Sequence, residues 1–196
     1  MKYYLLDASA IIHYYIPSQL TTKINKLIEK KQQGEVFLFI PIFCIAETYN
    51  TFAKYYYRER KITEDNYNSI YKKFTDDVRR GKLFYQIELN RWHVMNVDYI
   101  SPIEHTWFTT KKNKEDEENE RKVDWYLSTF DILFIAVGIE LAKMLGRNDI
   151  NLVTCDDRIK TIGNTLRKLD SKKLKENKIP LETPFPEVIS LRSLII

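Results

Sequence analysis

The stretch MKYYLLDASAII, residues 1–12, decides how the rest of the sequence is interpreted. Its short apolar run, Tyr3–Leu6, predicts a buried strand, and Asp7 follows where that strand should end. In open α/β sheets, ligands bind just beyond the carboxyl ends of the strands. The same arrangement recurs near the C-terminus, where the run Ile150–Val153 leads into Asp156. Two strand ends that each deliver a carboxylate predict a shared cation site.

The hydrophobic pattern between these two runs alternates between helical spacing and continuous apolar stretches. Strands that alternate with helices predict a central parallel sheet covered by helices on both faces, which is a three-layer α/β/α sandwich. The expected strands are Tyr3–Leu6, Val36–Ile40, Leu83–Leu89, Ile150–Val153 and Glu187–Leu191, and the expected helices are Ala10–Tyr15, Thr22–Gln33, Ile42–Tyr57, Glu64–Arg80, Asn90–Tyr99, Asp131–Leu145 and Arg158–Leu169.

The length of 196 residues and the hydrophobic content of 44% predict a single domain, 1–196, with an elaborated middle region at about 58–127. Within that region, 111–122 is charged throughout, and its bases and acids balance. This charged insertion cannot supply core surface, so we expect an exposed helix or a surface loop, with a substrate lid as the alternative.

The sequence predicts a cytoplasmic protein. No apolar stretch is long enough for a membrane helix, and the opening run is too short for a signal peptide. Cys44 and Cys155 lie in apolar contexts, which favours free thiols in a reducing compartment.

Asn164–Lys178 has six bases against two acids and accounts for the whole net charge of +4. This basic segment could hold a polyanion or could simply be a solvated face.

Two further acids lie in apolar surroundings. Glu47 falls in the first turns of the helix expected after Val36–Ile40, and Asp131 opens a strongly apolar helix. A carboxylate in such a setting is costly unless it is paired or binds a metal ion, and a helix N-terminus tolerates its charge. Each acid alone could be a simple helix cap. Together with Asp7 and Asp156 they predict one carboxylate site.

Clustered carboxylates repel one another unless a cation lies between them. Oxygen ligands without histidine or cysteine suit Mg²⁺ or Mn²⁺. Zinc does not fit, because His13, His93 and His105 have no metal-ligand spacing with the cysteines. One or two Mg²⁺ or Mn²⁺ ions in such a site can activate water against a phosphodiester.

Four motifs in this order resemble the acidic motifs of PIN-domain ribonucleases, a family that includes the VapC-type toxins of bacterial toxin–antitoxin pairs. The motifs are YLLDASAII, IPIFCIAET, STFDILFIAVG and LVTCDDR, and the resemblance covers roughly 1–57 and 127–165. It implies a PIN-like α/β/α fold and cleavage of RNA with Mg²⁺ or Mn²⁺. The catalytic and metal-binding residues that it implies are Asp7, Glu47, Asp131 and Asp156.

The resemblance also implies supporting residues and partners. Ser9 and Thr154 match small hydroxyl positions that would orient the carboxylates, whereas Asp157 is expected to support the site or cap the next helix. RNA is the expected partner, and an antitoxin protein is a further candidate. Apolar surface on the early helices could also support a homodimer.

Independently of the resemblance, Arg58, Arg60 and Lys61 follow the run Tyr55–Tyr57 and could form a backbone-and-stacking patch for RNA, with core or interface as the alternative role of the tyrosines. Arg158 and Lys160 are further candidate RNA-binding residues.

Two alternatives remain open. A noncatalytic RNA- or protein-binding module on the same fold would be expected to have lost one or more of the four acids, and all four are present. A metal-dependent nuclease that acts on DNA would use the same site, because metal chemistry at a phosphodiester does not depend on the sugar. A Rossmann nucleotide-binding domain is disfavoured, because 7–12 contains no glycine.

Overall fold

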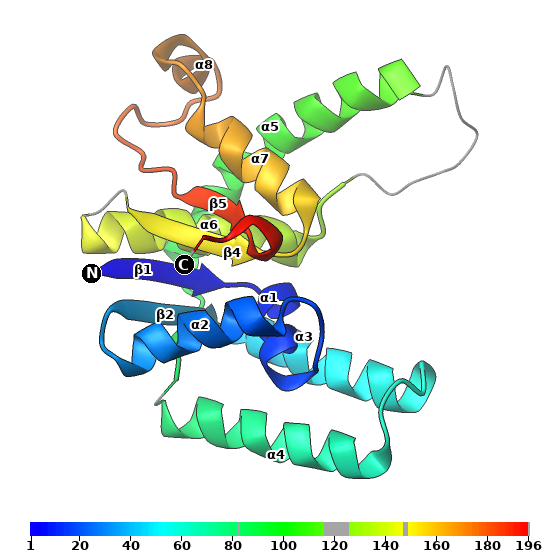
Figure 1. Cartoon of the computed structure of the whole chain (residues 1–196). Helices are drawn as coiled ribbons and strands as arrows, with labels where there is room; N and C mark the ends of the chain where they lie inside the picture. The colour runs from blue at the N-terminus through cyan, green and yellow to red at the C-terminus, as the bar shows by residue number, and fades with distance from the viewer. Residues whose placement is uncertain (82, 116–125, 147–148, 196) are drawn as a thin grey trace. The chain divides into compact units, whose positions relative to one another are not determined.

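The computed structural model describes residues 1–81, 83–115, 126–146 and 149–195. The predicted α/β class is confirmed, with a five-stranded central sheet flanked by helices (Figure 1). The elements follow in this order: β1 Lys2–Leu6, α1 Ala8–Tyr15, α2 Thr21–Gln32, β2 Val36–Pro41, α3 Ile42–Ala53, the π-helix η1 Lys54–Arg58, α4 Glu64–Arg80, β3 Tyr85–Ile87, α5 Arg91–Glu115, α6 Thr129–Leu145, β4 Ile150–Thr154, α7 Asp157–Arg167, α8 Ser171–Glu176, β5 Glu187–Ser190 and the 3₁₀-helix η2 Leu191–Ser193.

The chain divides into two compact units, each made of discontinuous segments. Unit 1 comprises Met1–Glu88, Ile150–Cys155 and Ile189–Ile196, and unit 2 comprises Leu89–Asp149 and Asp156–Val188. None of the described helices is both long enough and apolar enough to cross a bilayer.

The sheet has the strand order β3-β2-β1-β4-β5, and β1 lies at its centre. β1 pairs in parallel with β2 and with β4, and β2 pairs in parallel with β3. Leu5 of β1 is fully buried and lies opposite Phe39 of β2 and Leu152 of β4. A strand buried on both faces is typical of a parallel sheet and explains the continuous apolar run in the sequence. The carboxyl ends of β1, β2 and β4 therefore share one edge of the sheet.

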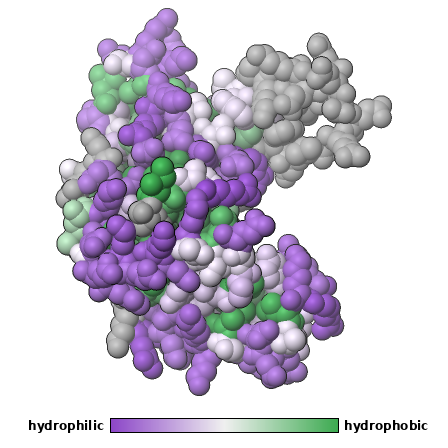
Figure 2. Space-filling model, in the orientation of Figure 1, coloured by the Kyte–Doolittle hydropathy of each residue, from purple (hydrophilic) through white to green (hydrophobic). Residues whose placement is uncertain are grey.

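Helices α1, α3 and α4 form the aromatic part of the unit 1 core. The ring of Tyr15 packs edge-on against Phe52 and Phe74, and all three side chains are buried. The Tyr15 hydroxyl donates to a carboxylate oxygen of Asp77 at 2.9 Å. On the face drawn in Figure 2, hydrophilic side chains dominate, and small apolar patches interrupt them over α3 and α4 at the lower right.

Unit 2 is built around α6. Nine residues of this helix are buried, which agrees with the apolar circumference predicted for 131–145. Asn96 of α5 donates to the Ala136 carbonyl at 3.3 Å and to Glu140 at 3.2 Å, so a polar network joins α5 to α6. α7 approaches Val188 so closely that a Cβ at Gly163 would lie 2.2 Å from its Cγ2 atom, which requires glycine there.

The structure corrects the expected end of one helix. A helix over 90–99 was expected to stop before Pro102, but α5 continues through Pro102 to Glu115. Proline removes one backbone hydrogen bond from a helix, at a cost of about 3 kcal/mol. Ile100 and Ile103 on either side of Pro102 are buried, and their packing offsets this cost. Of the charged insertion 111–122, residues 111–115 end this helix, and 116–122 lie outside the described residues.

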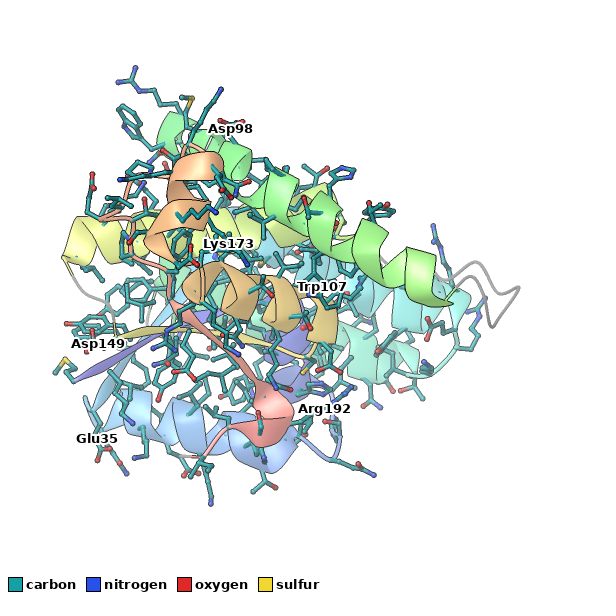
Figure 3. The ribbon with its side chains drawn as sticks, turned by 90° about the horizontal axis from the view of Figure 1, so that it is seen from above. Glu35, Asp98, Trp107, Asp149, Lys173 and Arg192 are labelled. Atoms are coloured by element: carbon teal, nitrogen blue, oxygen red, sulfur yellow. The ribbon has the colours of Figure 1, made fainter. Side chains whose placement is uncertain are left out.

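The structure also describes two further segments that the sequence singled out. The helix predicted over 42–57 ends as an α-helix at Ala53 and continues as the π-helix η1. The basic segment 164–178 spans the end of α7 and the whole of α8, and its six basic side chains are exposed. Figure 3 labels one of them, Lys173 on α8.

Candidate active site

Asp7 is placed by the end of β1. Its backbone N–H donates to the carbonyl of Val153 at 3.0 Å, which continues the β1–β4 ladder by one residue before α1 begins. The side chain is 7% exposed, so its carboxylate is almost wholly withdrawn from water. A buried carboxylate needs hydrogen-bond donors or cations around it. The surrounding side chains supply the donors.

Two hydroxyl groups hold one oxygen of this carboxylate. Ser9 donates to Oδ2 of Asp7 at 2.5 Å, and Thr154 donates to the same oxygen at 2.9 Å. Ser9 Oγ also accepts the backbone N–H of Cys155 at 2.9 Å. Residues 145 positions or more apart in the sequence are thus tied together around Asp7, because β1 and β4 are neighbours in the sheet.

Glu47 approaches Asp7 from α3. One carboxylate oxygen of Asp7, one of Glu47 and the sulfur of Cys44 all lie within 4.8 Å of one another, and we call this group the Asp7 cluster. Asp7 and Cys44 are buried, and Glu47 is half-buried. The Cys44 thiol lies 3.9 Å from Oδ1 of Asp7 and donates to it.

Sequence reasoning did not include Cys44 in the site. The usable signal was its spacing of three residues from Glu47, which places both side chains on one face of α3. Burial, followed by the charges of Asp7 and Glu47, raises the pKa of the Cys44 thiol well above its ordinary value. The thiol is therefore neutral at pH 7, and the oxygen donors of the Asp7 cluster are the carboxyl groups of Asp7 and Glu47. That donor set fits a hard divalent cation.

Asp131 and Asp156 lie in unit 2, and each lies at the N-terminus of a helix. Asp131 is the third residue of α6 and forms a capping box with Ser128, accepting the Ser128 backbone N–H at 2.8 Å. Asp156 is the N-cap of α7 and accepts the backbone N–H of Arg158 at 2.7 Å. Both acids therefore help to cap the N-terminus of a helix.

Arg158 joins these two acids. Its Nη2 atom lies 2.7 Å from Oδ2 of Asp156 and 3.9 Å from Oδ2 of Asp131. Its Nη1 atom donates to the carbonyl of Tyr126 at 2.9 Å. Burial raises the pKa of Asp156, but the hydrogen bonds and charge of Arg158 outweigh this, and the net pKa is below its ordinary value.

The expectation that Asp157 caps the next helix is wrong. The N-cap of α7 is Asp156, because its side chain accepts the backbone N–H of Arg158. Asp157 is the first residue of the helix, where its charge is favourable beside the helix N-terminus.

The candidate RNA-binding residues lie in different settings. Arg58 ends η1, Arg60 follows in the left-handed region with a φ of 52°, and Lys61 pairs with Glu59 at 2.5 Å. Lys160 is half-buried on α7, and Arg158 is engaged with the two acids described above.

The structure thus brings together Asp7 with Glu47 in unit 1, and Asp131 with Asp156 in unit 2. The hydroxyls of Ser9 and Thr154 contact Asp7. The convergence of all four acids on one cation remains a prediction.

No protein-family model matches the chain, and no curated protein sequence matches it. One solved structure with a similar fold is VapBC2 from Rickettsia felis, in a crystal with a DNA fragment from its promoter. The two chains share 12% identity and a TM-score of 0.47, with 96% of this chain and 98% of the other covered.

Proposed function

We propose that this protein is a nuclease that hydrolyses phosphodiester bonds in RNA with Mg²⁺ or Mn²⁺. The observation that carries the proposal is the Asp7 cluster: a buried carboxylate at the end of the central strand, met by a second carboxylate from α3. Paired carboxylates in this position are suited to holding a hard cation. RNA is proposed as the substrate because the four acidic motifs resemble those of PIN-domain ribonucleases.

The roles of the residues follow from their contacts. Asp7 and Glu47 would hold the ion, which supplies an activated water and stabilises the leaving oxygen. Ser9 and Thr154 keep one oxygen of the Asp7 carboxylate fixed, which limits the reorganisation needed when substrate binds.

Asp131 and Asp156 are the remaining proposed ligands. Asp156 follows Thr154 by two residues, so chain connectivity keeps its Cα within about 7 Å of the Cα of that hydroxyl residue. In this structure the guanidinium of Arg158 supplies positive charge to both acids. Arg158 is therefore proposed as the group that balances their charge before metal binds.

Cleavage of labelled single-stranded RNA and of the matching DNA, in Mg²⁺, Mn²⁺ or excess EDTA, tests the proposal. We expect RNA cleavage with metal and none in EDTA. Asp7→Asn keeps the shape of the side chain and removes the charge, and it should lower the rate at least about 100-fold, because a bound ion supplies several kcal/mol to the transition state. Asp157→Asn is the matched control and should stay within a few-fold of the wild type.

A second readout separates binding from catalysis. Mn²⁺ should raise the Tm of the wild-type protein, since a ligand that binds only the folded state stabilises it, and should leave the Tm of Asp7→Asn unchanged. Cleavage in EDTA, or a fully active Asp7→Asn variant, would contradict the mechanism. Tight RNA binding without cleavage in any metal would instead favour the noncatalytic module.

The sequence resemblance also implies a more specific role for this nuclease, as the toxin of a toxin–antitoxin pair. Induced expression in bacteria should then arrest growth with the wild type and not with Asp7→Asn, and an antitoxin would be the partner that relieves the arrest.

A further inference from the structure

A pocket of about 380 Å³ lies within unit 1, between the second half of α1 and the segment around η1. This volume falls in the range of sites that bind small molecules. Its apolar wall includes Ile12, Ile16 and Ile62, and its polar side includes His13, Tyr55 and Lys61. None of these six residues contributes to the Asp7 cluster.

The chain builds the polar side of this pocket in an uncommon way. After the π-helix, Arg60 adopts a left-handed φ of 52°, and the backbone N–H of Lys61 donates back to the carbonyl of Tyr55 at 2.9 Å. A non-glycine residue in this region costs about 1–2 kcal/mol. The result is that the Lys61 ammonium lies 4.8 Å from the centroid of the Tyr55 ring, in a cation–π contact.

The charges around the pocket favour an anionic ligand. Lys54 and Lys61 both pair with the single carboxylate of Glu59, at 3.1 and 2.5 Å, which leaves an excess of one positive charge. The hydrogen bond from Lys61 to Glu59 raises the pKa of Lys61, so the ammonium stays charged.

His13 contributes polarity to the pocket without adding charge. Its Nδ1 atom lies 2.7 Å from the hydroxyl of Ser18, and both residues line the pocket. Burial lowers the pKa of His13, and the positive charge of Arg192 lowers it further. Arg192 lies on η2, which packs beside α2, and is labelled in Figure 3. A second cation is therefore close enough to act on His13.

We propose that this pocket binds one nucleotide of a single-stranded RNA substrate, with its base between the Tyr55 ring and the isoleucine wall and its phosphate at Lys61. Aromatic rings beside cations are how proteins hold unpaired strands, whose bases are free to leave the stack. A small inorganic anion would not need the apolar wall, and an amphipathic protein helix would not need the ammonium group.

The pocket is also in reach of the proposed chemistry. His13 follows Asp7 by six residues along α1, which is about 9 Å at the helical rise. This inference rests on the proposed function and extends it. It names single-stranded RNA as the substrate that the Asp7 cluster would cut, and Lys61 as a residue that binds this RNA.

Binding of a fluorescent single-stranded RNA of about twelve nucleotides, measured by anisotropy in EDTA so that no cleavage occurs, tests the inference. Lys61→Met and Tyr55→Leu should each weaken binding at least about fivefold, which is the low end for one stacked base or one phosphate contact. Lys30→Met is the matched control, because it also removes one positive charge and one ion pair, with Glu35, but neither lines the pocket nor contacts Glu59. It should change the affinity less than twofold.

Equal affinities for Lys61→Met and Lys30→Met, or full affinity in Tyr55→Leu, would overturn the inference. So would unchanged RNA affinity in both pocket variants together with lost binding to a protein partner, which would assign the pocket to that partner.

The pocket inference and the proposed function can be refuted separately. Metal-dependent cleavage by the wild type with no effect of the pocket variants would refute only the pocket, and absence of cleavage in every metal would refute the proposed function.

Discussion

At the scale of single residues, Ser9 makes hydrogen bonds to two different parts of the chain. One hydroxyl donates to the buried Asp7 carboxylate and accepts the backbone N–H of Cys155. It therefore stabilises the buried side chain at the end of β1 and satisfies the first amide after β4. Removing a group that serves two partners leaves both of them short of a hydrogen bond, which costs more than the loss of an ordinary surface contact.

We expect Ser9→Ala to lower the free energy of unfolding by about 1–3 kcal/mol, because the Asp7 carboxylate and the Cys155 amide lose a partner that the interior does not replace. Urea denaturation at pH 7 measures this. Ser69→Ala, at an exposed position on α4, is the control and should be neutral or slightly stabilising, since alanine is the better helix former. A loss below about 0.5 kcal/mol for Ser9→Ala would show that water or a neighbour takes over its role.

At the scale of elements, the start of α5 uses histidine where a capping box usually has glutamate or glutamine. The Asn90 side chain accepts the backbone N–H of His93 at 3.3 Å, and Nδ1 of His93 accepts the backbone N–H of Asn90 at 3.0 Å. His93 is 1% exposed. Because Nδ1 acts as an acceptor, the neutral imidazole must carry its proton on Nε2. Protonation of Nδ1 would break the box.

This helix start should therefore be sensitive to acid. Burial lowers the pKa of His93, and the charge of Glu140 offsets only part of that effect. A histidine whose pKa is lower in the folded state takes up its proton first in the unfolded state. The stability that it contributes is complete above the unfolded pKa of about 6.5 and declines as the pH falls below it, by at most about 1.4 kcal/mol per pH unit.

Thermal unfolding of the wild type and of His93→Gln between pH 5 and 8 measures this decline. Glutamine keeps the acceptor and cannot take up the proton. We expect His93→Gln to lose stability from packing at every pH but to show a shallower decline below pH 6.5. Parallel curves for the two proteins would mean that His93 does not couple folding to pH.

At the scale of the whole molecule, the two compact units are not consecutive pieces of chain. The boundaries fall at 88/89, 149/150, 155/156 and 188/189, so the chain passes between the units four times. β4, which is almost wholly buried in unit 1, reaches its place only through chain that belongs to unit 2 on both sides. Neither unit can be cut out as a continuous segment.

We therefore expect the units to unfold together. Calorimetry should show one transition whose calorimetric enthalpy equals the van't Hoff enthalpy, as cooperative single domains do. Two resolved transitions, or a calorimetric enthalpy well above the van't Hoff value, would refute the prediction of a single domain over 1–196. The Ser9→Ala and His93→Gln variants carry changes in unit 1 and unit 2 respectively, so both should shift that single transition.

The sequence by itself determined the α/β class, the order of the strands and of the helices α1 to α7, and the acids at strand ends and helix starts, because apolar periodicity and capping chemistry are local. The short helix α8 was not predicted. Only the tertiary structure decided which side chains meet. Thr154 reaches Asp7 across 147 positions because β1 and β4 are neighbours, and Arg158 reaches Asp131 because α7 packs against α6. α5 continues through Pro102 for a similar reason. The sequence pattern shows only the local cost of a proline inside a helix, whereas the buried packing of Ile100 and Ile103 that outweighs this cost is tertiary.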